Sequence, residues 1–272
     1  MLKQRVVTAI ILLVLFLLAL FALPDAWWAI LVIVMVMQGA LEWTRLAKLS
    51  GTRANLYWWL TLAMMLGMFW FDIYHTIEQQ ALPHVLVYTV SAVFWLGIVP
   101  TWLMAGWEVE QPLLLALVGW VVLIPTGLAM LDLRGDHPLW LLGMMGLVWM
   151  ADIAAYFTGR RFGKNKLAPS ISPGKTWEGV AGAMVGVAAY VLVAWSFSGI
   201  SYTVLPVVLV AGWCWVGLAV FGDLFESAIK RQAGVKDSGA LLPGHGGLLD
   251  RIDALTSTLP LAALAILWRH LS

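Results

Sequence analysis

The chain has 272 residues, of which 62% are hydrophobic and 11% are charged, and its formal net charge is +1. Soluble domains carry about 25% charged residues, and no single core could bury so much apolar surface, so a soluble globular protein is excluded. The near-neutral charge gives no basic surface for nucleic acid. The single cysteine, Cys214, excludes a disulfide framework and a cysteine-rich zinc site. The apolar surface must therefore face lipid.

Long apolar runs predict the membrane-spanning helices in chain order. They cover residues 6–23, 26–44, 56–72, 82–104, 112–131, 138–158, 178–199, 202–225 and 254–270. The first run resembles a secretory signal peptide, but its length and the lack of a clear cleavage site favour a span. We therefore expect an all-α, polytopic integral membrane protein with about nine transmembrane helices. The short loops leave no room for a soluble domain, so residues 1–272 are predicted to form a single membrane domain.

The basic residues predict the orientation of these spans. If the N-terminus is cytoplasmic, only Arg134 and Arg269 of the 16 Lys and Arg residues fall on the other side of the membrane. Such a bias follows the positive-inside rule. We expect a multi-pass protein whose N-terminus is cytoplasmic and whose C-terminus lies on the opposite side.

The ionisable residues divide the chain into two unequal halves. Residues 1–136 carry almost no charges within their spans and are predicted to be mainly scaffold. Residues 137–272 are predicted to be the catalytic half, with two polar cytoplasmic loops at 159–177 and 227–253. An acid within a span, such as Asp152, is costly and indicates either a functional residue or a structural ion pair with Arg160 or Arg161.

The loop at 159–177 interleaves Lys and Arg with Gly, Ser and Thr, a combination that suits phosphate. Its Gly174-Lys175-Thr176 resembles the end of a P-loop, but Pro169 stands where the first glycine is required, and no strand precedes it. A helix that begins after Thr176 would still offer Lys175 and its first amides to an anion. The alternative is that these cations only contact anionic headgroups.

Carboxylates cluster around the loop at 227–253. On a helix that continues past its span, Asp223, Glu226 and Lys230 share one face with Ser227, because they are three or four residues apart. Asp250 and Asp253 likewise share a face. We expect Asp223, Asp250 and Asp253 to converge and, without cysteine partners, to hold Mg2+ or Mn2+ as a phosphate clamp.

The same carboxylates also permit structural interpretations. Asp250 and Asp253 suit the positive N-terminus of the last helix, and Asp223 could form a salt bridge with Lys230. His245, which lies among glycines, is either a turn residue or a contact to substrate or a proton carrier.

Three segments of the sequence resemble a known protein family. The stretch 227–253, SAIKRQAGVKDSGALLPGHGGLLDRID, is similar to the signature of phosphatidate cytidylyltransferases, also called CDP-diacylglycerol synthases. The segments ADIAAYFTGRRFGK (151–164) and SPGKTWEG (172–179) also resemble that family, whereas the first five spans resemble it in hydropathy alone. The resemblance implies transfer of the cytidylyl group from CTP to phosphatidate. CDP-diacylglycerol and pyrophosphate would form at the inner membrane, for phospholipid biosynthesis.

The resemblance also implies roles for individual residues. The predicted catalytic residues are Asp223, Asp250, Asp253, Lys230 and Arg251, of which the three aspartates would hold one or two Mg2+ ions, or Mn2+. The predicted nucleotide- and phosphate-binding residues are Lys175, Thr176, Ser172, Arg231, Lys236, Asp237, His245, Gly246 and Gly247. Asp152 and Glu178 would line the same site.

Other functions compete with this one. A CTP-dependent lipid kinase, or an enzyme that acts on an isoprenoid phosphate, would use similar chemistry on another lipid acceptor. A cation or phosphate transporter is disfavoured, because the polar residues gather at one membrane face and no inverted repeat is evident. Small residues such as Gly39, Gly67 and Gly97 permit close helix approach and are compatible with a homodimer without requiring one.

Overall fold

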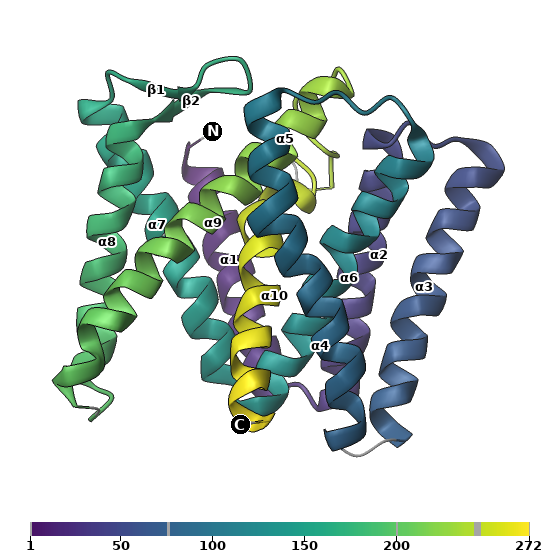
Figure 1. The fold of residues 1–272 in the computed structure, drawn as a ribbon, viewed down its shortest axis with the longest axis horizontal. Helices are drawn as coiled ribbons and strands as arrows, with labels where there is room; N and C mark the ends of the chain where they lie inside the picture. The colour runs from purple at the N-terminus through teal and green to yellow at the C-terminus, as the bar shows by residue number, and fades with distance from the viewer. Residues whose placement is uncertain (1, 75–76, 200, 242–245, 272) are drawn as a thin grey trace.

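The computed structural model describes residues 2–74, 77–199, 201–241 and 246–271. Its helices, shown in Figure 1, are α1 (Leu2–Ala22), α2 (Asp25–Leu46), α3 (Gly51–Tyr74), α4 (Ile77–Val93), α5 (Val99–Ala105), α6 (Pro112–Asp136), α7 (Pro138–Phe162), α8 (Trp177–Ser196), α9 (Leu205–Gln232) and α10 (Leu249–Leu271). A π-helical turn, Phe94–Ile98, joins α4 to α5, and a 3-10 turn, Tyr202–Val204, precedes α9. Eight described helical segments are long and apolar enough to cross a membrane. The prediction of an all-α polytopic membrane protein is confirmed.

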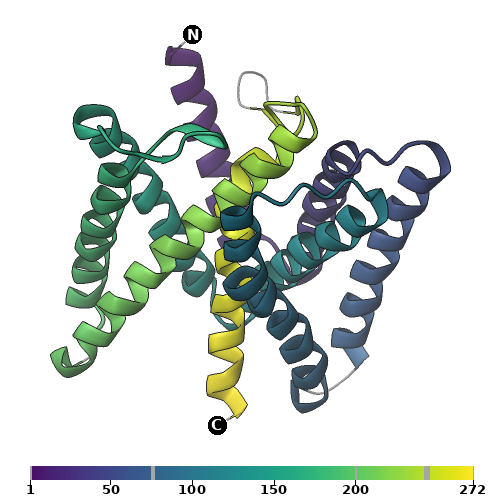
Figure 2. The same ribbon diagram turned by 45° about the horizontal axis from the view of Figure 1, so that its top comes forward.

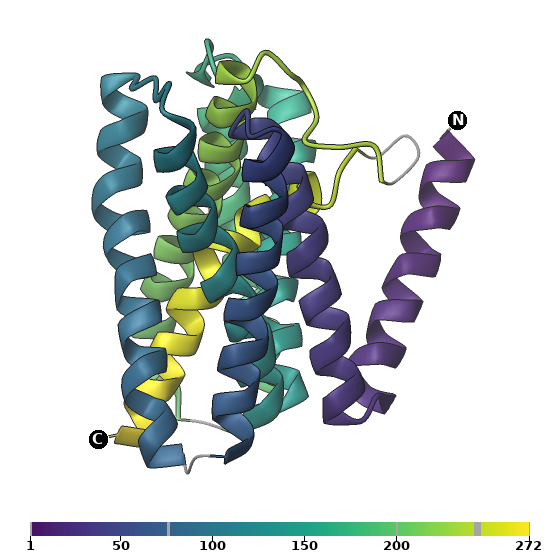
Figure 3. The same cartoon turned by 90° about the vertical axis from the view of Figure 1, so that its right-hand side faces the viewer.

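The predicted spans fall on these helices and on the helical turns that join them. The first, 6–23, lies on α1, which has 21 residues. The eighth, 202–225, continues as α9 to Gln232, as the helical spacing of the polar residues after 225 predicted. The two termini lie at opposite ends of the bundle (Figure 1). Figure 3 shows α1 at the edge of the bundle, beside α2.

Helix starts and ends follow local sequence signals. Pro112 and Pro138 are the first residues of α6 and α7, where a missing backbone N–H costs nothing. Gly106 ends α5 with a φ of 62°, a left-handed conformation that glycine adopts without strain.

The core lies where α2, α6 and α10 meet. Trp28 and Trp43 of α2 are buried, and their indole nitrogens donate to the carbonyl oxygens of Met130 (3.2 Å) and Leu115 (2.7 Å) on α6. These bonds satisfy the indole N–H groups, which a membrane interior could not do. Large apolar side chains remain exposed around the bundle, as expected for a surface that faces lipid.

The glycines that suggested a dimer differ in their surroundings. A Cβ atom at Gly39 would lie 2.9 Å from Leu123 Cδ2, so this glycine permits α2 to approach α6 within one chain. Around Gly67 and Gly97, a Cβ atom would meet no atom of the described residues within 4 Å. The homodimer stays a prediction.

A short antiparallel hairpin lies in the loop at 159–177. Strand β1 (Lys166–Ala168) pairs with β2 (Ser172–Thr176), and Lys166 lies opposite Thr176. The sequence predicted only a loop here, because strands of three and five residues show no readable alternation. Figure 2 shows the hairpin extending from the ends of α7 and α8 toward α9. We call the end of the bundle with this hairpin and the described parts of the α9–α10 connection (233–241 and 246–248) the hairpin face, and the other end the opposite face.

Candidate functional site

Most of the sequence-predicted site residues lie at the hairpin face, on elements distant in the sequence. Asp152 lies on α7, Lys175 on β2, Asp223 on α9 and Asp253 on α10. In Figure 1 the hairpin and the described parts of the α9–α10 connection are at the upper end of the bundle. The structure thus brings the two predicted polar loops to one end of the molecule.

Lys175 reaches from the hairpin to α9. Its Nζ atom lies 2.6 Å from Oδ2 of Asp223, and both side chains are about one quarter to one third exposed (25% and 30%). Ser227, one turn further along α9, donates to Oδ1 of Asp223 at 3.3 Å. A predicted phosphate-binding cation and a predicted metal-binding carboxylate are therefore partners.

The Asp223–Lys230 salt bridge, which the sequence left open, is not formed between these described residues. Lys230 instead lies 2.5 Å from Oδ1 of Asp250 and 3.4 Å from Oε2 of Glu226. Asp223 is paired with Lys175. Two separate lysines thus partner two separate groups of carboxylates.

The backbones of α9 and α10 approach closely beside Asp223. A Cβ atom at Gly222 would lie 2.6 Å from the carbonyl oxygen of Asp253 and 2.6 Å from Oγ of Ser257. Only glycine therefore permits this crossing, which brings Asp223 within electrostatic reach of Asp253 and Asp152. Three carboxylates and Lys175 form one charged group at the crossing.

Glu226 is a buried acid that lacks hydrogen-bond donors. It is 5% exposed, and neither of its carboxylate oxygens accepts a hydrogen bond from a residue that the structure describes. Among the described residues, it forms an ion pair with Lys230, whose Nζ atom lies 3.4 Å from Oε2. Because buried carboxylates are normally saturated with donors, this group is chemically suited to a cation.

Asp250 organises the α9–α10 connection. Its Oδ2 atom accepts hydrogen bonds from the backbone N–H (2.9 Å) and hydroxyl (3.0 Å) of Ser238 and from the N–H of Gly247 (2.8 Å). Gly246 has a φ of 82°, and a Cβ atom there would lie 2.6 Å from Asp250 Oδ2. With Lys230 on its other oxygen, Asp250 is fully engaged by protein donors, so its role as a metal ligand stays a prediction.

Glu42 on α2 is a site residue that the sequence analysis did not find. Its buried carboxylate accepts from Ser238 Oγ and from the backbone N–H groups of Leu248 and Leu249, each at 2.9 Å. Gln38 also donates to it at 2.9 Å. Glu42 thereby caps the start of α10 from a distant helix. An acid in the predicted span 26–44 was the signal that could have revealed it.

Residues at the start of α8 hold the hairpin. Thr176 is the N-cap, since its hydroxyl accepts from the N–H of Gly179 at 3.1 Å, as predicted for a helix that begins after it. Glu178, expected to line the site, accepts from the backbone and side chain of Asn165 at 2.7–3.2 Å. It therefore ties the start of the hairpin to α8.

The other predicted site residues lie around this centre. Arg231 donates to the carbonyl oxygens of Ile171 (3.3 Å) and Val235 (3.4 Å), which joins α9 to the hairpin turn. Lys236, Asp237 and Arg251 are exposed, Ser172 begins β2 and is half-buried, and Gly247 is buried against Glu42. His245 lies outside the described residues.

A second group of potential metal ligands lies at the opposite face. Asp72, His84 and Asp132 offer ligand atoms that all lie within 4.8 Å of one another, a spacing compatible with a divalent metal. The sequence analysis did not single out these residues, because they belong to three helices and follow no motif.

The amino-acid sequence matches a known protein family and several named proteins. The model of a family described as "Cytidylyltransferase family" matches residues 3–268. The phosphatidate cytidylyltransferase of Haemophilus influenzae is 36% identical, over 96% of each chain. That of Pseudomonas aeruginosa is 37% identical, over 98% of this chain and 97% of the relative. That of Thermotoga maritima is 44% identical over 122 residues, 42% of this chain and 44% of the relative.

Proposed function

Because this chain belongs to the cytidylyltransferase family, we propose that it transfers the cytidylyl group from CTP to phosphatidate and releases pyrophosphate. The family indicated by the signature is confirmed by the match across residues 3–268. Two nearly full-length relatives that are named phosphatidate cytidylyltransferases support the choice of lipid acceptor. The observation that carries the proposal is the gathering of Lys175, Asp223 and Asp253 at one face.

The chemistry joins two polyanions. A phosphate oxygen of phosphatidate attacks the α-phosphorus of CTP, and the bond from that phosphorus to the bridging oxygen breaks as pyrophosphate leaves. Such a transfer requires positioning and charge neutralisation more than covalent help. Lys175 and Lys230 would supply positive charge at the centre, and the exposed Arg231, Lys236 and Arg251 would bind phosphate oxygens around it.

Both lysines are paired with carboxylates. A substrate phosphate that binds Lys175 would take the place of Asp223, whose oxygen would then be available to a cation. Binding of phosphate and binding of a cation would thus favour each other at this pair. This coupling requires no large movement of a helix.

We propose Mg2+ or Mn2+ as the cation, one or two ions, held by Asp223 and Asp253. The donor-free carboxylate of Glu226 and the absence of cysteine from this site's signature segments support a hard cation. When bound, such an ion neutralises charge that develops on the phosphates. Asp250 would contribute by holding Ser238 and Gly247, and thereby the α9–α10 connection, in place.

We also propose that the hairpin face is cytoplasmic, in the inner membrane of a bacterial cell. The basic segments 159–177 and 227–253 belong to this face, and positive charge is retained on the cytoplasmic side. The N-terminal end lies at the same side of the bundle in Figure 1, and the C-terminal end lies at the other.

Two radiolabels on CTP distinguish the proposal from its rivals. Purified protein in detergent is incubated with phosphatidate and Mg2+, with label either in the cytosine or in the γ-phosphate. Cytosine label in the lipid, with an equal amount of pyrophosphate and loss of both with a chelator, is the expected result. Label only from the γ-phosphate would instead establish a lipid kinase. Transfer to isoprenoid phosphate without transfer to phosphatidate would overturn the choice of acceptor.

A further inference from the structure

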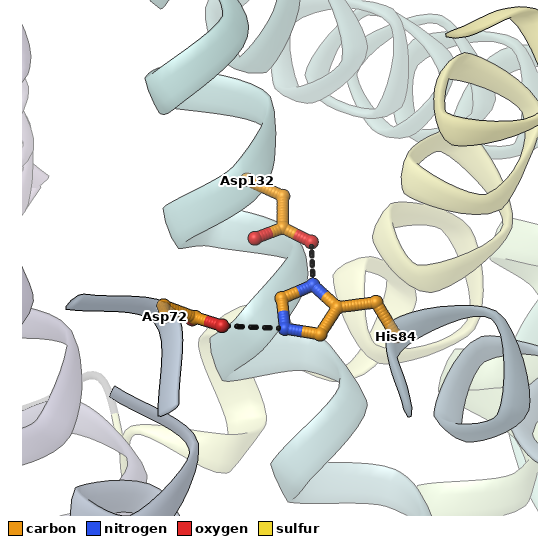
Figure 4. A group of neighbouring side chains, drawn as sticks. All are labelled: Asp72, His84 and Asp132. Carbon is orange, nitrogen blue, oxygen red and sulfur yellow. Dashed lines mark hydrogen bonds and ion pairs between the residues drawn. The ribbon is translucent and has the colours of Figure 1, made fainter. Parts of the chain in front are cut away.

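A polar cluster at the opposite face is not used by the proposed reaction. Asp72 lies near the end of α3, His84 near the start of α4 and Asp132 near the end of α6. Figure 4 shows the imidazole ring of His84 between the two carboxylates. Nδ1 lies 2.7 Å from Oδ2 of Asp132, and Nε2 lies 3.0 Å from Oδ1 of Asp72. His84 itself is only 4% exposed.

The ring of His84 is held in a fixed orientation. Oδ2 of Asp132 accepts from the hydroxyl of the fully buried Tyr88 at 2.6 Å and also engages Nδ1 of His84. With Nδ1 bound to Asp132, Nε2 is directed at Asp72. A histidine that is held by a carboxylate on one nitrogen while the other points to a second ligand is the arrangement common at metal centres.

The cluster lines a cavity of about 620 Å3. The charged and titratable residues of its wall are Asp25, Asp72, His84, Asp132, Arg134 and Asp136. Arg134 is paired with Asp25 at 2.7 Å, so the rest of the wall holds three carboxylates and one imidazole. This excess of negative charge at the end of a membrane bundle favours a cation in the cavity.

We propose that this cluster binds a divalent transition-metal ion, for which Zn2+ is the probe. Nε2 of His84 and a carboxylate oxygen of Asp72 would be the ligands, Asp132 would orient the ring, and water in the cavity would complete the coordination. Two ligands on a tetrahedral ion with bonds of about 2.1 Å lie about 3.4 Å apart. The present separation of 3.0 Å would therefore widen by a few tenths of an ångström as the ion takes the place of a proton.

The ligand set also argues for the type of ion. One imidazole nitrogen with carboxylate oxygens suits Zn2+ and its neighbours in the first transition row. The Mg2+ site proposed at the hairpin face, by contrast, has only carboxylate ligands among the described residues. The two sites therefore differ in location and in ligand chemistry, and the second does not depend on the proposed reaction.

Zinc binding to the full-length protein tests the inference. Purified protein in detergent is equilibrated with Zn2+ in the presence of excess Mg2+, which occupies the carboxylates of the hairpin face, and bound zinc is counted per chain. We expect one Zn2+ in the wild type and its loss in His84→Ala. Asp132→Asn should weaken binding by about 10–100-fold, since it removes only the orienting carboxylate.

His137→Gln is the matched control, because His137 is an exposed histidine near the same cavity that caps α7 through its Nδ1 atom. Replacement of Zn2+ by Co2+ adds a second readout, because the visible absorption of bound Co2+ reports its nitrogen and oxygen ligands. A purely structural role of His84 would not produce this absorption. Equal zinc binding by wild type and His84→Ala would overturn the proposal. So would the absence of bound zinc in a folded wild type, or loss of zinc in His137→Gln alone. Asp72→Asn is the second variant should His84→Ala fail to fold, and it should also lose the ion.

Discussion

The two faces of the bundle carry polar clusters of different construction. At the hairpin face, Lys175 and Lys230 are paired with carboxylates, so each partner can exchange its counter-charge for a phosphate or a cation. At the opposite face, His84 lies between two carboxylates, and the cavity wall includes Arg134, already paired with Asp25, but no lysine. The counter-charge of each cluster therefore decides which kind of ligand the cluster suits. The first cluster suits anionic substrates together with a metal, and the second suits a cation alone.

The largest expected effect is a loss of cytidylyl transfer that a substitution at the hairpin face causes and one at the opposite face does not. Asp223→Asn removes a proposed cation ligand and the partner of Lys175, so cytidylyl transfer should fall about a hundredfold or more. The steady-state rate with saturating CTP and Mg2+ measures this loss. Asp25→Ala, an exposed change at the opposite face, is the control and should retain activity. Near-normal turnover of Asp223→Asn would remove the hairpin face from the mechanism.

The next largest effect is expected from a substitution where α9 crosses α10. Gly222→Ala places a methyl group 2.6 Å from the Asp253 carbonyl oxygen, and such overpacking costs about 1–3 kcal/mol. A lower thermal midpoint in detergent and reduced transfer should appear together. Gly217→Ala, on the same helix, meets no described atom within 4 Å and should leave both unchanged or slightly improved. Equal behaviour of the two alanine variants would contradict the close crossing.

A substitution of Glu42 tests whether residues 1–136 are only a scaffold or also support the site at the hairpin face. Glu42→Gln keeps the size of the side chain but leaves one oxygen to serve Ser238 and the N–H groups of Leu248 and Leu249. Because hydrogen bonds to charged groups contribute about 1.5–3 kcal/mol to stability, we expect a lower thermal midpoint in detergent and a reduced rate of cytidylyl transfer. Faster proteolysis of the α9–α10 connection should accompany these changes. Gln38→Ala, which removes only one donor to Glu42, should change all three far less.

The smallest effect is expected at the rim of the opposite face. The Asp25 side chain is 98% exposed, whereas its partner Arg134 is buried and also donates to the carbonyl oxygen of Leu20 at 2.9 Å. Asp25→Ala should therefore change stability by less than about 1 kcal/mol. Arg134→Met, by contrast, should lower the thermal midpoint clearly, because it leaves carbonyl groups without donors. A large loss in Asp25→Ala would show that this rim pair matters more than its exposure suggests.

Much of the fold was predictable, because bilayer thickness dictates the length of apolar runs and local spacing fixes helix faces. The continuation of α9 through Lys230 and the cap at Thr176 follow from such local signals. Contacts between distant helices were not predictable. The bond from Leu249 to Glu42 spans 207 residues, and the ligands at the opposite face come from three helices. A single sequence carries no periodic or motif signal for such neighbours.

The most direct test of the account is the sidedness of the reaction. Sealed membrane vesicles of both orientations, which contain the protein and phosphatidate, are given cytosine-labelled CTP and Mg2+ from outside only. We expect label to enter the lipid in inside-out vesicles, whose hairpin face is exposed, and to enter it in right-side-out vesicles only after detergent opens them. Equal labelling of intact vesicles of both orientations, or labelling of right-side-out vesicles alone, would contradict the placement of cytidylyl transfer at the hairpin face.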